Sequence, residues 1–238
     1  MAKLVSRDDN APWRRRLTLP AYQVKEAARY AGITSQTILN WQKDGISSGA
    51  ALSSRDKGVA LSYLQLVEVA FVAALRKIGV KLEDIRNAHD YMAQKLSAEY
   101  PFAQHRFKTD GQDILMELPQ FVKGASKQKL VVVNRGGQTG WAEVLKTKFE
   151  EFDYLNDLAI RWKPAGKSSH IEIDPRISFG APIVDGIPTW AIKGRWDAGE
   201  SLEDIADDFS LKPSLVKEAL QFEGIVTNNN KNIQAWSN

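Results

Sequence analysis

The residue types that most often carry catalysis are sparse in this chain of 238 residues. It has no cysteine, and its three histidines, His89, His105 and His170, lie in unrelated segments with no nucleophile motif beside them. The glycine-rich stretch 136–140 lacks the Lys-Ser/Thr continuation of a phosphate-binding loop, so we interpret it as a hairpin turn. Without cysteine, disulfides, thiolate metal sites and cysteine nucleophiles are excluded. The sequence therefore predicts a protein that is not an enzyme and that needs neither cofactor nor metal.

Hydrogen bonding to nucleic acid is the chemistry that residues 22–45 could perform. Their apolar periodicity predicts a first helix whose small residues allow close packing, a tight turn at Gly32 and a short second helix. Thr34 is placed to cap that second helix. Polar side chains follow on it: Ser35, Gln36, Thr37 and Asn40. Gln and Asn can pair with adenine edges in the major groove, and Ser or Thr can reach phosphates or bases.

Charge is divided unevenly between the two ends of the chain. Residues 1–57 hold ten Lys and Arg against five Asp and Glu, whereas residues 199–223 hold seven acidic residues against two lysines. Six basic residues flank the predicted helix pair and could neutralise DNA phosphates: Arg14, Arg15, Arg16, Lys43, Arg55 and Lys57. The asymmetry predicts a polyanion partner for the N-terminal end and a different partner for the other end.

Three segments follow one another in a recognisable order: residues 24–28, residues 32–41, and residues 64–85 with a helix corner at 75–85. Through these segments residues 20–96 resemble the MerR family. The resemblance implies a winged helix-turn-helix that binds double-stranded DNA. Two positions depart from it: Leu39 stands where the family usually has arginine, and Gly58-Val59-Ala60 replaces a Gly-Tyr-Arg wing, so we favour Arg55 and Lys57 as phosphate ligands. Soft-metal sensing, frequent in that family, is not expected because there are no cysteines.

Two longer helices are predicted behind this head. Ser62 and Gln65 form a capping-box pattern at the start of a helix over 64–78 that is apolar on more than one face and is therefore expected to be buried. An amphipathic helix is predicted over Leu82 to Leu96, and it is too short for a stable coiled coil on its own.

The acidic C-terminal part repeats the first helix pair at an offset of 178 residues. Leu202, Ala206, Leu211 and Val216 then fall on Val24, Ala28, Ile33 and Ile38. Six carboxylates are expected on its surface: Glu203, Asp204, Asp207, Asp208, Glu218 and Glu223. Because so many carboxylates would repel DNA, we expect contact with a protein, with Glu203, Asp204, Asp207 and Asp208 as the partner-binding residues.

The segment before these helices carries a spaced motif of Asp174-Pro175, Gly180-x-Pro182 and Gly186-x-Pro188. Residues 169–223 thereby resemble a small C-terminal domain of unknown function that recurs in antitoxins of the VapB class. Only Ile187 stands where members usually carry Thr-Arg. A MerR-like head joined to this domain resembles an antitoxin subgroup whose partner is a PIN-domain ribonuclease toxin.

The predicted fold class is mainly α with a small β-containing middle, between an N-terminal winged helix-turn-helix and a C-terminal helix-turn-helix-like helical domain. We expect a DNA-binding domain at 1–100, a mixed α/β middle at 101–168, the antitoxin-type domain at 169–223 and a polar tail at 224–238. Short strands are predicted at 114–116, 130–133, 158–162 and 170–173, and a linker at 164–169. No apolar run approaches the roughly 18 residues of a membrane helix, and the start does not read as a signal peptide, so a cytoplasmic location is expected.

Two functional hypotheses remain open from the sequence. The first is a DNA-binding antitoxin, dimeric on its operator, that neutralises a PIN-domain toxin and represses its own operon. The second is a free-standing MerR-like transcription factor whose C-terminal domain only dimerises it. A neighbouring gene for a small PIN-type nuclease would discriminate between them.

Overall fold

The computed structural model describes residues 12–46, 48–77, 79–104 and 149–227. The chain divides into two compact units, residues 1–167 (unit 1) and 168–238 (unit 2), and the division falls inside the predicted linker 164–169. Within the described residues the structure is mixed α/β with substantial helix. The predicted strands at 114–116 and 130–133, the glycine-rich stretch 136–140 and His105 lie outside the described residues.

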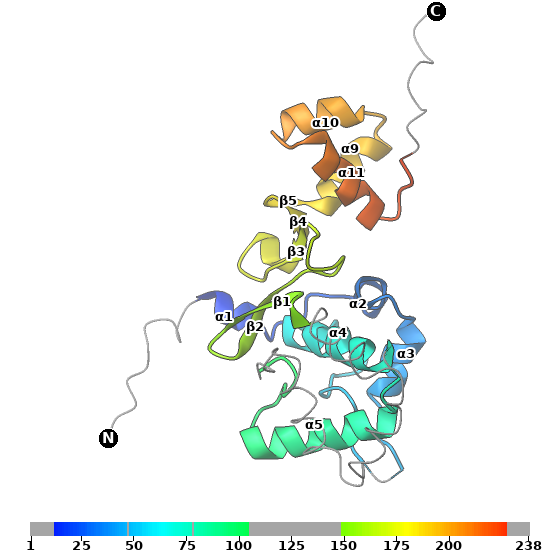
Figure 1. Ribbon diagram of the computed structural model, residues 1–238, viewed down its shortest axis with the longest axis vertical. Coiled ribbons are helices and arrows are strands. Elements are labelled where there is room, and N and C mark those ends of the chain that lie inside the picture. The colour runs from blue at the N-terminus through cyan, green and yellow to red at the C-terminus, as the bar shows by residue number, and fades with distance from the viewer. Residues whose placement is uncertain (1–11, 47, 78, 105–148, 228–238) are drawn as a thin grey trace, which may run out of the picture. The chain divides into compact units, whose positions relative to one another are not determined.

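Unit 1 is built around one buried helix. Its elements are α1 (Pro12–Arg16), α2 (Val24–Ala31), α3 (Ser35–Trp41), α4 (Tyr63–Lys77), α5 (Leu82–Leu96), β1 (Phe152–Leu155) and β2 (Leu158–Trp162). Figure 1 shows α4 between α5 and the hairpin of β1 and β2. Twelve of the fifteen residues of α4 are buried, as its apolar character on several faces predicts.

Reciprocal capping fixes the start of α4. The Ser62 N–H donates to Gln65 Oε1 at 2.9 Å, and the Gln65 N–H donates to Ser62 Oγ at 3.3 Å. Two otherwise unpaired backbone donors are thereby satisfied, which confirms the predicted capping box.

Aromatic residues from distant parts of the chain complete the core of unit 1. The ring of Phe71 on α4 lies 4.7 Å from that of Phe102 and 4.8 Å from that of Phe149, measured between centroids. The antiparallel β1–β2 hairpin adds Trp162, whose ring stacks on Phe152 at 5.9 Å. Strand β2 has the bounds predicted from the sequence. Residues 100–104 and 149–162 therefore share a core with the N-terminal helices.

Unit 2 joins a small antiparallel sheet to three helices. Strands β3 (Ile171–Ile173), β4 (Pro182–Val184) and β5 (Ile187–Pro188) precede α9 (Thr189–Asp197), α10 (Leu202–Asp208) and α11 (Pro213–Phe222), and a 3-10 turn, η2 (Ser178–Gly180), lies between β3 and β4. In Figure 1 α9 and α11 pack beside the β4–β5 hairpin, and α10 packs against these two helices. Ile192, Ile205, Val216 and Leu220 are fully buried in their shared core. The predicted helical domain is present, and the segment punctuated by proline and glycine adds short strands to it.

Candidate nucleic-acid and protein interfaces

The turn between α2 and α3 is held by local backbone bonds. Gly32 has a left-handed backbone with φ of 67°, and its N–H donates to the Arg29 carbonyl at 3.2 Å. The next N–H, of Ile33, donates to the Ala28 carbonyl at 2.9 Å, which is the Schellman pattern of a helix end. Ala27, Ala28 and Ile38 are buried between the helices. The small residues thus allow the close approach that the sequence predicts.

Thr34 caps α3, as predicted. Its Oγ1 accepts the Thr37 N–H at 3.2 Å and lies 2.8 Å from Thr37 Oγ1. These two hydroxyls therefore bond to each other and to the start of α3, which leaves Ser35, Gln36 and Asn40 as the polar outer surface of the helix.

That outer surface is a small hydrogen-bonded cluster of amides. Gln36 and Asn40 are exposed, and Ser35 is half-buried. The Gln36 Nε2 group donates to Asn40 Oδ1 at 3.1 Å, and the Lys43 ammonium donates to the same oxygen at 3.5 Å. These bonds order the amide of Asn40, the last residue but one of α3, beside an exposed cation.

The predicted phosphate ligands occupy different environments. Arg15 and Lys57 are exposed, whereas Arg14 and Arg16 on α1 are half-buried, and the guanidinium of Arg14 lies 5.2 Å from the ring of Trp13. Arg55 is also half-buried and donates to the Val59 carbonyl, and to Gln42 Oε1 at 3.2 Å. Arg55 therefore ties the loop after α3 back onto that helix.

A buried polar cluster anchors the same loop, and the sequence analysis does not identify it. The Ser53 N–H donates to Glu68 Oε2 at 3.0 Å. Ser53 Oγ lies 2.6 Å from the same oxygen and 2.6 Å from the Glu99 carbonyl oxygen. The single hydroxyl proton of Ser53 can be donated to only one of these two acceptors at a time. His89 Nε2 is 3.4 Å from Glu68 Oε1. Ser, His and Glu are also the residue types of a hydrolase triad, but here all three are buried. We interpret them as a structural link between the loop, α4 and α5.

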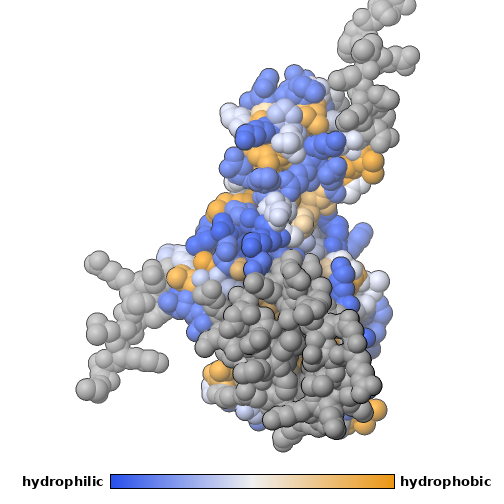
Figure 2. Space-filling view, in the orientation of Figure 1, coloured by the Kyte–Doolittle hydropathy of each residue, from blue (hydrophilic) through white to orange (hydrophobic). Residues whose placement is uncertain are grey.

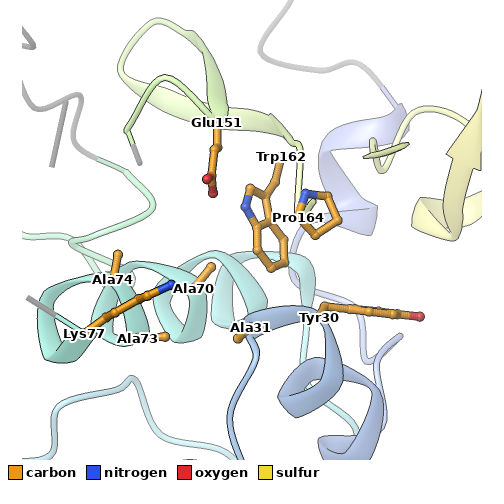
Figure 3. Close-up of a pocket in the computed structure, with 9 residues that line it drawn as sticks. All are labelled: Tyr30, Ala31, Ala70, Ala73, Ala74, Lys77, Glu151, Trp162 and Pro164. Atoms are coloured by element: carbon orange, nitrogen blue, oxygen red, sulfur yellow. The ribbon is translucent and has the colours of Figure 1, made fainter. Parts of the chain in front are cut away.

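One cavity of about 80 Å³ lies between α2, α4 and β2 (Figure 3). It is lined by Tyr30, Ala31, Ala70, Ala73, Ala74, Lys77, Glu151, Trp162 and Pro164. Its volume is well below the several hundred Å³ of a usual small-molecule site. Within the described parts of the chain, no group of three or more His, Asp or Glu residues is arranged to hold a metal ion.

The helix pair α10–α11 reproduces the α2–α3 turn at the predicted offset of 178. Ser210 takes the position of Gly32, with φ of 54°. Its N–H donates to the Asp207 carbonyl at 3.1 Å, and the Leu211 N–H donates to the Ala206 carbonyl at 2.8 Å. The bonds match those of Gly32 and Ile33 one for one. The internal repeat predicted from apolar positions is therefore present in the backbone.

Two carboxylates placed on the acidic surface by the sequence analysis are half-buried, and each has a partner within unit 2. Glu218 accepts hydrogen bonds from Ser169 Oγ at 2.6 Å and from the His170 N–H at 3.0 Å, and it pairs with the His170 ring at 2.9 Å. Glu223 accepts the hydroxyl proton of Thr189. These two predicted surface charges are therefore only partly exposed, because each side chain finds a partner from a distant segment.

The four predicted partner-binding carboxylates are all exposed, with different local roles. Asp208 pairs with Arg195 at 2.5 Å, and the same guanidinium pairs with Glu200, so these two carboxylates raise the pKa of Arg195. The Asp204 N–H donates to Ser201 Oγ at 3.1 Å, which caps the start of α10. Glu203 and Asp207 show no ion pair within the described residues and point their charge to solvent.

Hydrogen bonding decides the ionisation of Glu218. Partial burial favours the neutral acid, but the bonds from Ser169 and His170 outweigh it and lower the pKa of Glu218 below its ordinary value. The carboxylate therefore stays charged where it joins α11 to the start of β3.

Known proteins resemble this chain both over unit 2 alone and over most of its length. Residues 171–222 match the family described as "Protein of unknown function (DUF433)", which supports the domain predicted for 169–223. The chain is 25% identical over 227 residues to the putative antitoxin VapB45 of Mycobacterium tuberculosis, which spans 86% of this chain and 94% of that protein. It shares its fold with the crystal structure of Rv2018 from Mycobacterium tuberculosis, at a TM-score of 0.67 and 24% identity, over 86% of this chain and 99% of that one. No helix in the described residues is both long and apolar enough to span a membrane.

Proposed function

We propose that this chain is a non-catalytic antitoxin that binds operator DNA through unit 1 and a toxin protein through unit 2. The observation that carries the proposal is that two helix pairs, α2–α3 and α10–α11, share the same turn but lie in units of opposite charge balance. Unit 1 has twenty-six basic and eighteen acidic residues, and unit 2 has six basic and eleven acidic residues. Since DNA is a polyanion, the two copies of one arrangement suit different partners.

The DNA-binding half of the proposal rests on α3 and the basic residues around it. Asn40 and Gln36 offer amides of the type that pair with adenine, and α3 is the second helix of its pair, which is the one that enters the major groove in helix-turn-helix proteins. Arg15, Lys43 and Lys57 are the exposed cations for phosphates, with Arg14, Arg16 and Arg55 beside them. We assign this head to the MerR-like winged class and expect a homodimer on a two-fold operator.

The toxin-binding half rests on unit 2. A relative is named a putative antitoxin, and the resemblance to antitoxins of the VapB class implies a PIN-domain ribonuclease as the partner. A nuclease must bind RNA through basic surroundings, which an acidic domain can cover. Glu203 and Asp207 are the carboxylates best placed for this, because the carboxylate of Asp204 accepts a hydrogen bond from Ser201 and that of Asp208 pairs with Arg195.

Co-expression tests the proposal directly. The product of the adjacent open reading frame, induced alone, is expected to arrest growth, and the full chain is expected to restore growth and to co-purify with it. If the neighbouring product is not a ribonuclease, or if the chain fails to restore growth, the antitoxin function is contradicted. Sequence-specific DNA binding without any toxin would instead support the alternative of a free-standing transcription factor.

A further inference from the structure

We propose that the outward face of α9, formed by Trp190, Gly194 and the Lys193–Asp197 ion pair, is the surface on which unit 2 docks a basic protein through an apolar anchor. The inference rests on the proposed function and names the docking surface within it. This face lies on α9, whereas the predicted partner-binding carboxylates lie on α10.

Trp190 is the first observation. It lies in the first turn of α9 with 63% of its surface exposed, although its neighbours Thr189 and Ile192 are fully buried. The other tryptophan of this helix, Trp196, packs against the core of unit 2. Figure 2 shows hydrophobic residues emerging at scattered points on the mainly hydrophilic surface of this unit. A large exposed aromatic side chain is the residue type that most often anchors a protein interface.

Gly194 is the second observation. It lies four residues after Trp190, on the same side of α9, and it is exposed. A side chain there would meet nothing within 4 Å, so the fold of unit 2 does not require glycine. Glycine inside a helix costs about 0.5–1 kcal/mol relative to alanine. Its absent side chain leaves bare backbone on the same side of α9 as Trp190, where a partner can approach closely.

Charge decides which partner fits. The two basic residues of α9 are neutralised: Lys193 pairs with Asp197, and Arg195 pairs with both Glu200 and Asp208. Glu203 and Asp207 on α10 add further negative charge to a unit that already has an excess of acidic residues. A second copy of unit 2 would bring like charges together, whereas a basic protein would be attracted. The face is therefore assigned to a basic partner and not to self-association.

Two substitutions in the full chain separate binding from folding. Trp190→Ala removes the anchor, and Gly194→Gln fills the open space beside it while replacing a poor helix former. Both are expected to weaken binding of a catalytically inactive form of the adjacent-gene nuclease at least tenfold in titration calorimetry. Gly194→Gln is expected to keep or raise the melting temperature of the unbound chain, because nothing opposes the new side chain.

Matched controls use the same changes elsewhere in unit 2. Ser214→Gln introduces the same side chain at an exposed position of α11, and Val226→Ala trims another exposed hydrophobic residue. Both are expected to leave the affinity unchanged.

The outcomes distinguish this inference from the proposed function. If the wild-type chain binds the nuclease and both variants bind with wild-type affinity, the α9 face is overturned while the antitoxin function stands. If the wild-type chain does not bind, the proposed function itself fails. If Trp190→Ala weakens self-association in sedimentation without changing affinity for the nuclease, the face is a self-interface and the inference is wrong.

Discussion

In the proposed function, the recognition of specific DNA bases depends on Asn40. Its amide is ordered by Gln36 and Lys43, so less conformational freedom would be lost if it paired with a base, as we propose. Arg15, exposed on α1, is suited to a phosphate, which carries no sequence information. The two residues therefore predict two different mutant behaviours.

Asn40→Ala is expected to cost about 1–3 kcal/mol on the preferred DNA and to reduce discrimination against other sequences. Arg15→Ala is expected to weaken binding to all DNA and to flatten the dependence of affinity on salt concentration. Fluorescence anisotropy at several salt concentrations measures both effects. Equal losses on specific and random DNA for Asn40→Ala would remove it from the base-reading role.

Glu218 gives unit 2 a defined acid sensitivity. Its pKa is lowered in the folded chain, so its ionised form stabilises the native state above the pKa of the unfolded carboxyl, about 4.3, and this contribution is lost as the pH falls through the folded pKa. Glu218→Gln is expected to lower stability at pH 7 and to flatten the fall in stability that occurs as the pH drops below the pKa of the unfolded carboxyl. Hydrogen exchange of residues 168–227 at several pH values measures the stability of unit 2. If this stability depended on pH in the same way in Glu218→Gln and in the wild type, the role of Glu218 would be contradicted.

At the scale of elements, the repeated turn offers a reciprocal test of backbone strain. Gly32 and Ser210 occupy the same left-handed position in two equivalent helix pairs, but only glycine adopts that conformation without cost. Gly32→Ser is expected to destabilise unit 1 by about 1 kcal/mol, and Ser210→Gly to stabilise unit 2 by up to about 1 kcal/mol.

Urea unfolding, followed by hydrogen exchange in each unit, measures the two changes. Ser214→Gly in the first turn of α11 is the control, and it is expected to destabilise because that residue is helical. If Ser210→Gly destabilised as much as this control, the two turns would not be equivalent in energy.

The elements that local rules govern are those that the sequence predicts well. Helices α2, α3, α4 and α5 follow from apolar periodicity, and the caps at Thr34, Ser62 and Ser201 follow from residue type and spacing. The short helix α1 and the strands β4 and β5 have too few residues to show a period.

Side chains whose environment is set by distant segments could not be placed. Glu218 meets His170, which is 48 residues earlier, and Glu223 meets Thr189, which is 34 residues earlier. Glu68 lies on a helix that is apolar on several faces, and this was the available signal for a buried charge, but its partners Ser53 and His89 come from a loop and from α5. From residue type alone, Glu218, Glu223 and Glu68 are each predicted to be surface charges.

At the scale of the whole molecule, we propose that two copies of one helix arrangement bind different partners, DNA in unit 1 and a toxin in unit 2. The N-terminal head cannot be cut free at about residue 100, because Phe102, Phe149 and Trp162 share its core. Tests of DNA binding and of the expected homodimer therefore need the full chain.

The most direct test is one DNA titration and one toxin titration of the same three full-length proteins: wild type, Asn40→Ala, and the double variant Glu203→Lys with Asp207→Lys. The account predicts that Asn40→Ala loses affinity for the DNA upstream of its own gene and binds the toxin normally. The double variant is predicted to lose affinity for the toxin and to bind DNA at least as tightly as the wild type. DNA affinity that is unchanged by Asn40→Ala, together with toxin affinity that is unchanged by the double variant, would contradict the division of labour.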